Sequence, residues 1–339
     1  MHMLKTAFCL LWLGGNATAI LHNLYVGSFN ASAIHHVSFD DEKLTLSLVQ
    51  SFSAADPHYW IGFDHDKKNI YTTSGSKWTS YKIADNLSIV LEQSLPLTGS
   101  CPGSQSIFLK ASPKPPYRAI DYGPGSGVHG LAFGSCNEML YSADDTGNAV
   151  WRHRVDTNTG RLQFMERMDA PVPGANPRHI VVHPHGAVAY VVFEGTNQLA
   201  VYTIKTGGKL FYTNMSYPLI LSEDRNADFW SDEVSLSYSH SYLWATSRSY
   251  QTGIPGYVTA FALSPSGMID SQLFLTPTLT SCGLANAVTP SDFLDEFLAL
   301  TDNEVGFVQI WRFDGKNAAI VDTLELDGEG CCANAIWYD

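Results

Sequence analysis

The sequence predicts an all-β protein, a seven-bladed β-propeller, and three observations lead to this prediction. First, a unit of short antiparallel strands recurs about every 50 residues, which is the length of a propeller blade. Second, no long stretch has the 3.6-residue apolar period of an amphipathic helix. Third, the two ends of the chain read as strands of one unit, which would close the ring and remove its open sheet edges.

The repeating unit consists of an apolar strand, a turn that contains Asp, Pro, Gly or Asn, and a returning strand rich in Tyr, Leu and Ala. RHIVVHPHGAVAYVVF (178–193) shows the pattern clearly, because turn residues separate two β-rich runs. In most units a third strand, such as LAVYTI (199–204), and a more polar fourth strand follow. The units begin near residues 59, 129, 178, 233, 286 and 334. The last five starts are 49, 55, 53 and 48 residues apart, as expected for four short strands in each blade.

The first and last segments complete one blade between them. NAIWYD (334–339) supplies an opening strand, and LHNLYVGSF (21–29) and AIHHVSF (33–39) supply its neighbours. We therefore expect residues 20–339 to form one propeller domain in which N- and C-terminal strands share a blade.

The third blade is predicted to be truncated. The units at 59 and 129 are 70 residues apart, which is too long for one blade and too short for two. Between them, SIFLKAS (106–112) has the character of another opening strand, but only KPPYRAIDYGPGSG separates it from the next unit. The sequence thus predicts seven opening strands and a third blade without its two outer strands.

The N-terminus has the features of a secretory signal peptide over residues 1–19. Lys5 is followed by the apolar run AFCLLWLGG and by Ala17-Thr18-Ala19, a small-x-small cleavage site. A short membrane anchor is the alternative, but the apolar run is too short to span a bilayer, and no later segment is long enough either. We expect a secreted or cell-wall-associated protein with no membrane span.

The net charge of the chain and its predicted secretion indicate which partners and modifications to expect. The formal charge of −13 argues against nucleic acid as a partner. In a secreted chain the sequons at Asn30, Asn86 and Asn214 are candidate glycosylation sites on surface loops. The sequence leaves the oligomeric state open.

Five cysteines remain after the signal peptide, so at least one thiol is free or pairs with another chain. Cys282 and the adjacent Cys331 and Cys332 each precede neighbouring blade starts, so we predict a disulfide between Cys282 and one of the pair. A free thiol of Cys331 or Cys332 near the channel is the alternative.

Arg178 and Glu194 are the first site candidates, because a hairpin brings them to the same end of two paired strands. They form either a site for a charged substrate or a structural ion pair. Competing motifs are weaker. GSGVHG (125–130) precedes a strand and not a helix, which disfavours a dinucleotide site, and the histidines of RHIVVHPH (178–185) favour a turn over a metal site. The absence of GxSxG disfavours a hydrolase with a serine nucleophile elbow.

Longer motifs resemble one known family. They include GFDHDKKNIY (62–71), VHGLAF (128–133), DAPVPGANPRHIVVHP (169–184), NAVTPSDFLDEFLALTD (286–302) and the terminal NAIWYD. From Leu21 to Asp339 the chain resembles the fungal carboxy-cis,cis-muconate cyclases, the eukaryotic 3-carboxymuconate lactonizing enzymes. The resemblance implies a seven-bladed propeller of the lactonase type and the cofactor-free closure of 3-carboxy-cis,cis-muconate to its lactone in aromatic catabolism.

The resemblance also implies an active site of one histidine, two arginines and one glutamate. These are His129 in VHGLAF, Arg178 in NPRHIVV, Glu194 in VVFEGTN and Arg248 in ATSRSY. Arg178 and Arg248 would bind substrate carboxylates, since the guanidinium group offers two parallel donors. His129 and Glu194 would be the acid/base candidates, and no metal would be needed.

Two other functions stay open at this stage. One is a propeller lactonase that hydrolyses a sugar or aromatic lactone. The other is a secreted glycoprotein that keeps the scaffold but has lost catalysis, which the signal peptide, the sequons and the short third blade favour.

Overall fold

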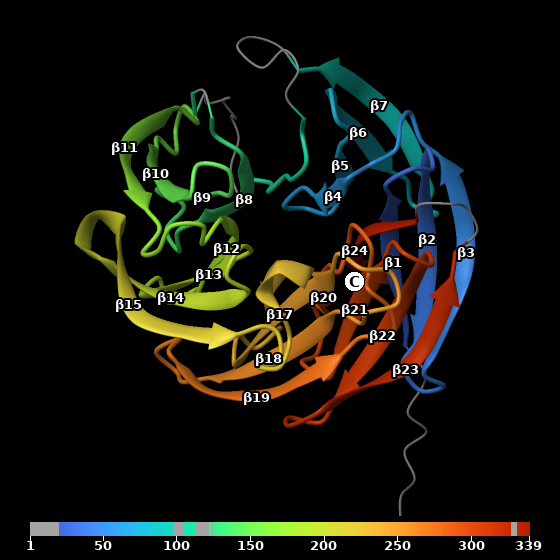
Figure 1. The fold of residues 1–339 in the computed structure, drawn as a ribbon. Coiled ribbons are helices and arrows are strands. Elements are labelled where there is room, and N and C mark those ends of the chain that lie inside the picture. Colours follow the sequence, from blue (N-terminus) through green and yellow to red (C-terminus); the bar gives the residue numbers. More distant parts are fainter. Residues whose placement is uncertain (1–19, 98–104, 113–121, 124, 327–330) are drawn as a thin grey trace, which may run out of the picture.

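The computed structural model describes residues 20–97, 105–112, 122–123, 125–326 and 331–339. Its regular structure is β, apart from the two short 3₁₀ helices η1 (Thr206–Gly208) and η2 (Asn226–Asp228). The predicted signal peptide, residues 1–19, lies outside the described residues. The described strands form six antiparallel four-stranded sheets, each one blade of a ring (Figure 1). The predicted all-β propeller is therefore confirmed.

The six blades follow one another around the ring, beginning with the blade that contains both termini (Figure 1). The closing blade consists of β24 (Cys331–Tyr338), β1 (Leu21–Ser28), β2 (Ala33–Asp40) and β3 (Thr45–Ser53), and the next blade of β4 (Trp60–Phe63), β5 (Asn69–Thr73), β6 (Lys77–Ile83) and β7 (Ile89–Pro96). The third sheet consists of β8 (Val128–Phe133), β9 (Met139–Asp144), β10 (Ala149–Val155) and β11 (Leu162–Asp169), and the fourth of β12 (Pro177–Val182), β13 (Val188–Phe193), β14 (Gln198–Lys205) and β15 (Lys209–Pro218). The fifth sheet consists of β16 (Phe229–Leu236), β17 (Tyr242–Ser249), β18 (Tyr257–Leu263) and β19 (Ile269–Pro277), and the sixth of β20 (Val288–Pro290), β21 (Phe297–Asp302), β22 (Phe307–Phe313) and β23 (Ala318–Glu325).

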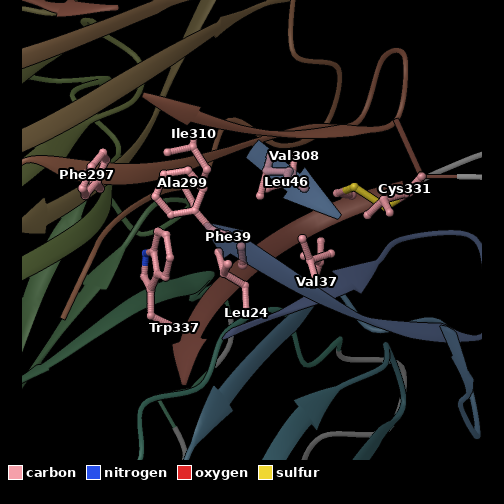
Figure 2. Close-up of a cluster of buried hydrophobic side chains, with 14 residues drawn as sticks. Leu24, Val37, Phe39, Leu46, Phe297, Ala299, Val308, Ile310, Cys331 and Trp337 are labelled. Carbon is pink, nitrogen blue, oxygen red and sulfur yellow. A yellow bond between two sulfur atoms is a disulfide. The ribbon is translucent and has the colours of Figure 1, made fainter. Parts of the chain in front are cut away.

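The termini close the ring as predicted. β24 pairs with β1 in an antiparallel register that places Leu24 opposite Trp337. The closing blade packs against the β20–β23 blade through a cluster that includes Phe39, Phe297 and Ile310 (Figure 2). Similar apolar layers join the other neighbouring sheets, except the β4–β7 and β8–β11 blades, which no such cluster of described residues connects. The core is thus a set of interfaces between blades, because both faces of most sheets are covered.

The prediction of seven blades is wrong, since the described residues form six four-stranded sheets. Residues 105–112, predicted to open a third blade, instead lie as an extended thread between the β4–β7 and β8–β11 blades (Figure 1). Within the described chain their strand pairing is one isolated bridge, between Ser106 and Gly75. A single strand without outer partners cannot satisfy its backbone donors and acceptors in a ladder. The thread is held by side chains instead: Phe108 packs on Trp60 with ring centroids 4.8 Å apart.

The predicted bridge from Cys282 does not form. Cys331 and Cys332 are joined to each other, and Cys282 is a free, buried thiol. The reason is local, because the Sγ atom of Cys282 lies 3.3 Å from the hydroxyl of Thr278 inside its own loop. The alternative of a free thiol at position 331 or 332 is excluded with it.

The three predicted glycosylation sites lie at the surface, but the structure does not test whether they carry glycans. Asn30, Asn86 and Asn214 are all exposed, so each could accept a glycan without unfolding the protein. No described helix is long and apolar enough to cross a membrane.

Candidate active site

Three neighbouring inner strands have an irregular register at the same level of the ring. The shifts lie between Val128 and Gly130 in β8, between Pro177 and Ile180 in β12, and between Ser231 and Val234 in β16. Such bulges re-aim side chains and are frequent beside active sites. The residues inside them are His129, Arg178, His179, Asp232 and Glu233.

Arg178 is held between two carboxylates. Its Nη1 donates to Oε2 of Glu194 at 2.5 Å, because Pro177 pairs with Phe193 and so brings the start of β12 to the end of β13. Its Nε donates to Oδ1 of Asp232 at 3.0 Å. Burial opposes the charge of Arg178, but Asp232 and Glu194 outweigh this effect and raise its pKa. The sequence therefore placed Arg178 and Glu194 together correctly and missed the second carboxylate.

Arg248, in β17, approaches the same aspartate from the next blade. Its Nε lies 3.8 Å from Oδ2 of Asp232, and its Nη1 donates to the carbonyl oxygen of Leu284 at 2.6 Å. The guanidinium carbon lies 4.6 Å from the ring centre of Trp230, a cation–π contact. Burial and the charge of Arg178 lower the pKa of Arg248. The two arginines thus repel each other, and Asp232 holds them in place.

Asp232 is the centre of this arrangement. Its Oδ2 also accepts the backbone N–H of Asn286 at 3.0 Å. Burial alone would raise the pKa of Asp232, but the charges of Arg178 and Arg248 lower it to about 2. The carboxylate is therefore ionised across the whole physiological range.

His129 lies beside the arginines on β8. Its ring is 4.8 Å from that of His179, and its buried Nδ1 has no hydrogen-bond partner among the described residues. Burial and the charges of Arg178, His179 and Arg248 hold the pKa of His129 well below its usual range. In these surroundings His129 is accordingly a neutral imidazole.

A cavity of about 340 Å³ connects these groups. Its polar wall contains His129, Arg178, Asp232 and Arg248. The rest of its wall is mostly apolar and includes Phe29, Tyr59, Trp60, Ile107, Leu284, Ala285, Ala287 and Ala333. Three of the four predicted site residues therefore share one cavity, whereas Glu194 supports Arg178 from behind.

Asp145 is a further acid near the site, in the turn after β9. Burial and the nearby Glu194 raise the pKa of Asp145 to about 6, against the opposing effect of Arg178. Its buried Oδ1 lacks a partner among the described residues. The sequence offered one usable signal for Asp232 and Glu233: Ser231-Asp232-Glu233 puts two consecutive acids into an inner strand.

The donor set suits an anion. Within the described part of the chain, no group of three or more His, Cys, Asp or Glu side chains is placed to hold a metal ion. Two guanidinium groups and an imidazole on one wall can bind carboxylates and stabilise negative charge that develops on them.

Comparisons with known proteins identify related sequences and structures. The family described as Lactonase, 7-bladed beta-propeller matches residues 116–278. The chain is 33% identical to the carboxy-cis,cis-muconate cyclase of Neurospora crassa, over 94% of this chain and 100% of that protein. It is 26% identical to muconate cycloisomerase 1 of Cutaneotrichosporon cutaneum, over 91% of this chain and 95% of that protein. The structure of the periplasmic gluconolactonase of Pseudomonas aeruginosa superposes with a TM-score of 0.73 at 16% identity, covering 94% of this chain and 99% of the other, and shares the fold.

Proposed function

The chain belongs to the carboxy-cis,cis-muconate cyclase family of lactonase-type propellers, and from this premise we propose that its channel site closes a carboxymuconate to its lactone. It is a lactonizing cycloisomerase, an intramolecular lyase by reaction type. The observation that carries the assignment to this site is the convergence of Arg178 and Arg248, from two blades, on the wall of one cavity.

The arginines bind and polarise the substrate. Among the described residues, the hydrogen bonds of Arg178 use Nε and Nη1, so its Nη2 is the donor that a substrate carboxylate can approach. Arg248 offers a second cation on the same wall. In lactone closure a carboxylate oxygen adds to a carbon–carbon double bond, and the adjacent carbon gains negative charge that is shared with its own carboxylate. Two fixed guanidinium groups stabilise that charge.

The proton that completes the reaction must come from a group on the cavity wall. His129 meets this condition, whereas Glu194 is bound to Arg178 outside the lining. A neutral imidazole is a poor acid, but a bound polyanion offsets the charges of Arg178 and Arg248 and favours protonation of His129. The imidazolium then donates its proton to carbon and recovers one from water. We therefore assign His129 as the general acid and Glu194 as the residue that holds Arg178.

Turnover of 3-carboxy-cis,cis-muconate, followed by loss of the diene absorbance, tests the proposal. We expect Arg248→Ala to lower kcat/KM by about 10²- to 10³-fold, because charge stabilisation in the transition state is lost. Arg178→Ala would leave Glu194 without its partner and Asp232 with one arginine in place of two, which endangers folding. Arg178→Lys keeps the charge but loses the two-pronged donor, and we expect a loss of about 10- to 100-fold.

Arg312→Ala is the matched control, because Arg312 pairs with Glu296 on the exposed side of its blade. Full activity of folded Arg248→Ala protein would contradict the assigned site. An inert wild-type chain would favour a scaffold without catalysis. Hydrolysis of lactones that carry no further carboxylate would favour the lactonase reading.

A further inference from the structure

Two parallel charge pairs, and not one, connect the inner strands β12 and β16. Arg178 pairs with Asp232 at 3.0 Å, and the next residue on each strand forms a second pair. In this second pair, Nδ1 of His179 lies 3.1 Å from Oε2 of Glu233, an electrostatic contact in which Oε2 has no hydrogen-bond partner among the described residues. All four residues lie inside the two bulges, so the irregular backbone that aims the arginine toward the cavity also places the histidine.

His179 is enclosed on several sides. It is 2% exposed and Glu233 is 8% exposed. Phe108 packs edge-on against the imidazole at 5.1 Å, and Trp60 lies at 5.7 Å. Phe108 belongs to the thread that takes the place of the third blade, so the shortened blade still contributes a wall to this site.

His179 lies against the proposed acid. The rings of His129 and His179 are 4.8 Å apart, and each ring has one buried nitrogen without a partner among the described residues, Nδ1 of His129 and Nε2 of His179. The carboxylate beside Nδ1 favours a proton on that nitrogen of His179. The other nitrogen, Nε2, is then left for the neighbouring imidazole or for a water between them.

We propose that His179, held by Glu233, is a positioning residue that orients His129 and sets the charge His129 carries through the reaction. The charged groups that act on the two imidazoles are Arg178 on β12, Asp232 and Glu233 on β16, and Arg248 on β17. Lys110 on the thread acts on Glu233. Arg178, Arg248 and His179 itself act against a proton on His129.

The inference rests on the proposed function only for its kinetic readout, because the charge of His129 can be followed directly. The experiment uses the full chain labelled with ¹⁵N-histidine, with the His129 signals assigned from a His129→Gln sample. We expect His179→Gln to raise the pKa of His129, since a group that disfavours its proton is removed. We expect Glu233→Gln to change the ¹⁵N shifts of His179, because the negative charge beside Nδ1 is lost.

Kinetics supply the second readout. In both variants kcat should fall about tenfold while KM stays within about twofold, with a shifted pH profile. The control is His153→Gln, which removes another buried histidine, on β10 beside Trp151 and Phe164, and should leave the His129 titration unchanged.

Unchanged titration of His129 in folded His179→Gln protein would overturn the inference, whether or not the wild-type chain turns over a muconate. The inference would also be overturned if kcat fell no further in His179→Gln than in the control His153→Gln. An inactive wild-type chain with a shifted His129 titration would contradict the proposed function and leave the inference standing.

Discussion

Asp232 and Asp145 approach the same arginines, but their pKa values are shifted in opposite directions. Burial would raise the pKa of Asp232, yet Arg178 and Arg248 bring it down to about 2. Burial and Glu194 raise the pKa of Asp145 to about 6. Asp232 therefore contributes stability above the unfolded pKa of about 4, and this contribution is lost as the pH falls toward 2. Asp145 does the reverse: its folded form binds a proton more tightly, so stability is lost as the pH rises from about 4 through 6.

These signs predict opposite effects of two matched substitutions. At pH 7, Asp145→Asn should stabilise the protein by on the order of 1 kcal/mol, and this gain should vanish near pH 4. Asp232→Asn should destabilise it by about 2–4 kcal/mol at pH 7, because two buried arginines lose their shared counter-ion. Urea unfolding of both variants at pH 4 and pH 7 measures the effects. A destabilised Asp145→Asn protein at pH 7 would contradict the account of Asp145.

Which site residues the sequence could predict depends on the backbone around them. His129, Arg178 and Arg248 stand at the ends or starts of strands in recognisable motifs, and these three predicted residues line the cavity. Asp232 and Glu233 were missed, because the regular alternation of a strand would turn two consecutive residues to opposite faces. The bulge between Ser231 and Val234 breaks this alternation, and no turn residue in the sequence marks it.

At the scale of elements, the contact between β8 and β12 fixes the distance from His129 to the arginine pair. Gly130 makes this contact possible, since a Cβ atom there would lie 2.6 Å from the carbonyl oxygen of Arg178 and 2.7 Å from Cα of His179. Both are backbone atoms of an inner strand, so they cannot rotate away as a side chain would. The glycine in VHGLAF is therefore required by the approach of two strands.

Gly130→Ala should push β8 away from β12. We expect a loss of about 1–3 kcal/mol in the free energy of unfolding, with a drop in kcat larger than any change in KM. Gly134→Ala is the control just after the same strand, because a Cβ atom there makes only ordinary contacts, the nearest at 3.4 Å to Met139. Thermal unfolding and steady-state kinetics of both variants measure this. Equal behaviour of the two variants would contradict a tight strand contact at Gly130.

At the scale of the whole molecule, the sequence repeat predicted correctly that the chain folds into propeller blades, but it predicted the wrong number of blades. Each unit with a complete hairpin pattern became a sheet, for example 178–193, which folds as β12 and β13. Residues 106–112 have a strand-like sequence, but strand character alone does not supply the partner strands that a sheet requires. The alignment with the Neurospora cyclase spans 365 positions, more than the 339 residues of this chain, so that relative contains residues which this chain lacks.

The ring therefore has two unlike places: a joint sealed by β24 and β1, and a break beside the β4–β7 blade, where no cluster of described residues packs it against β8–β11. Trp337 lies in the joint, 3% exposed, with its Nε1 bonded to the carbonyl oxygen of Thr289 at 3.0 Å and Phe293 at 5.3 Å. Trp78 lies on β6 and is 41% exposed, as its neighbour Leu95 is at 50%. Ile61, Ile70 and Tyr81 lie on one face of this blade, and that face packs on the closing blade. Trp78 lies on the opposite face.

Substitution of alanine for each of these two tryptophans compares how much the joint and the break contribute to the free energy of unfolding. Trp337→Ala should cost about 3–5 kcal/mol, because it removes a buried indole from the interface that closes the ring. Trp78→Ala should cost under about 1 kcal/mol, because water already reaches much of its ring. Urea unfolding gives both values under one condition. Equal, large costs would show that the Trp78 face is covered in solution, and that the propeller is sealed on both sides of the thread.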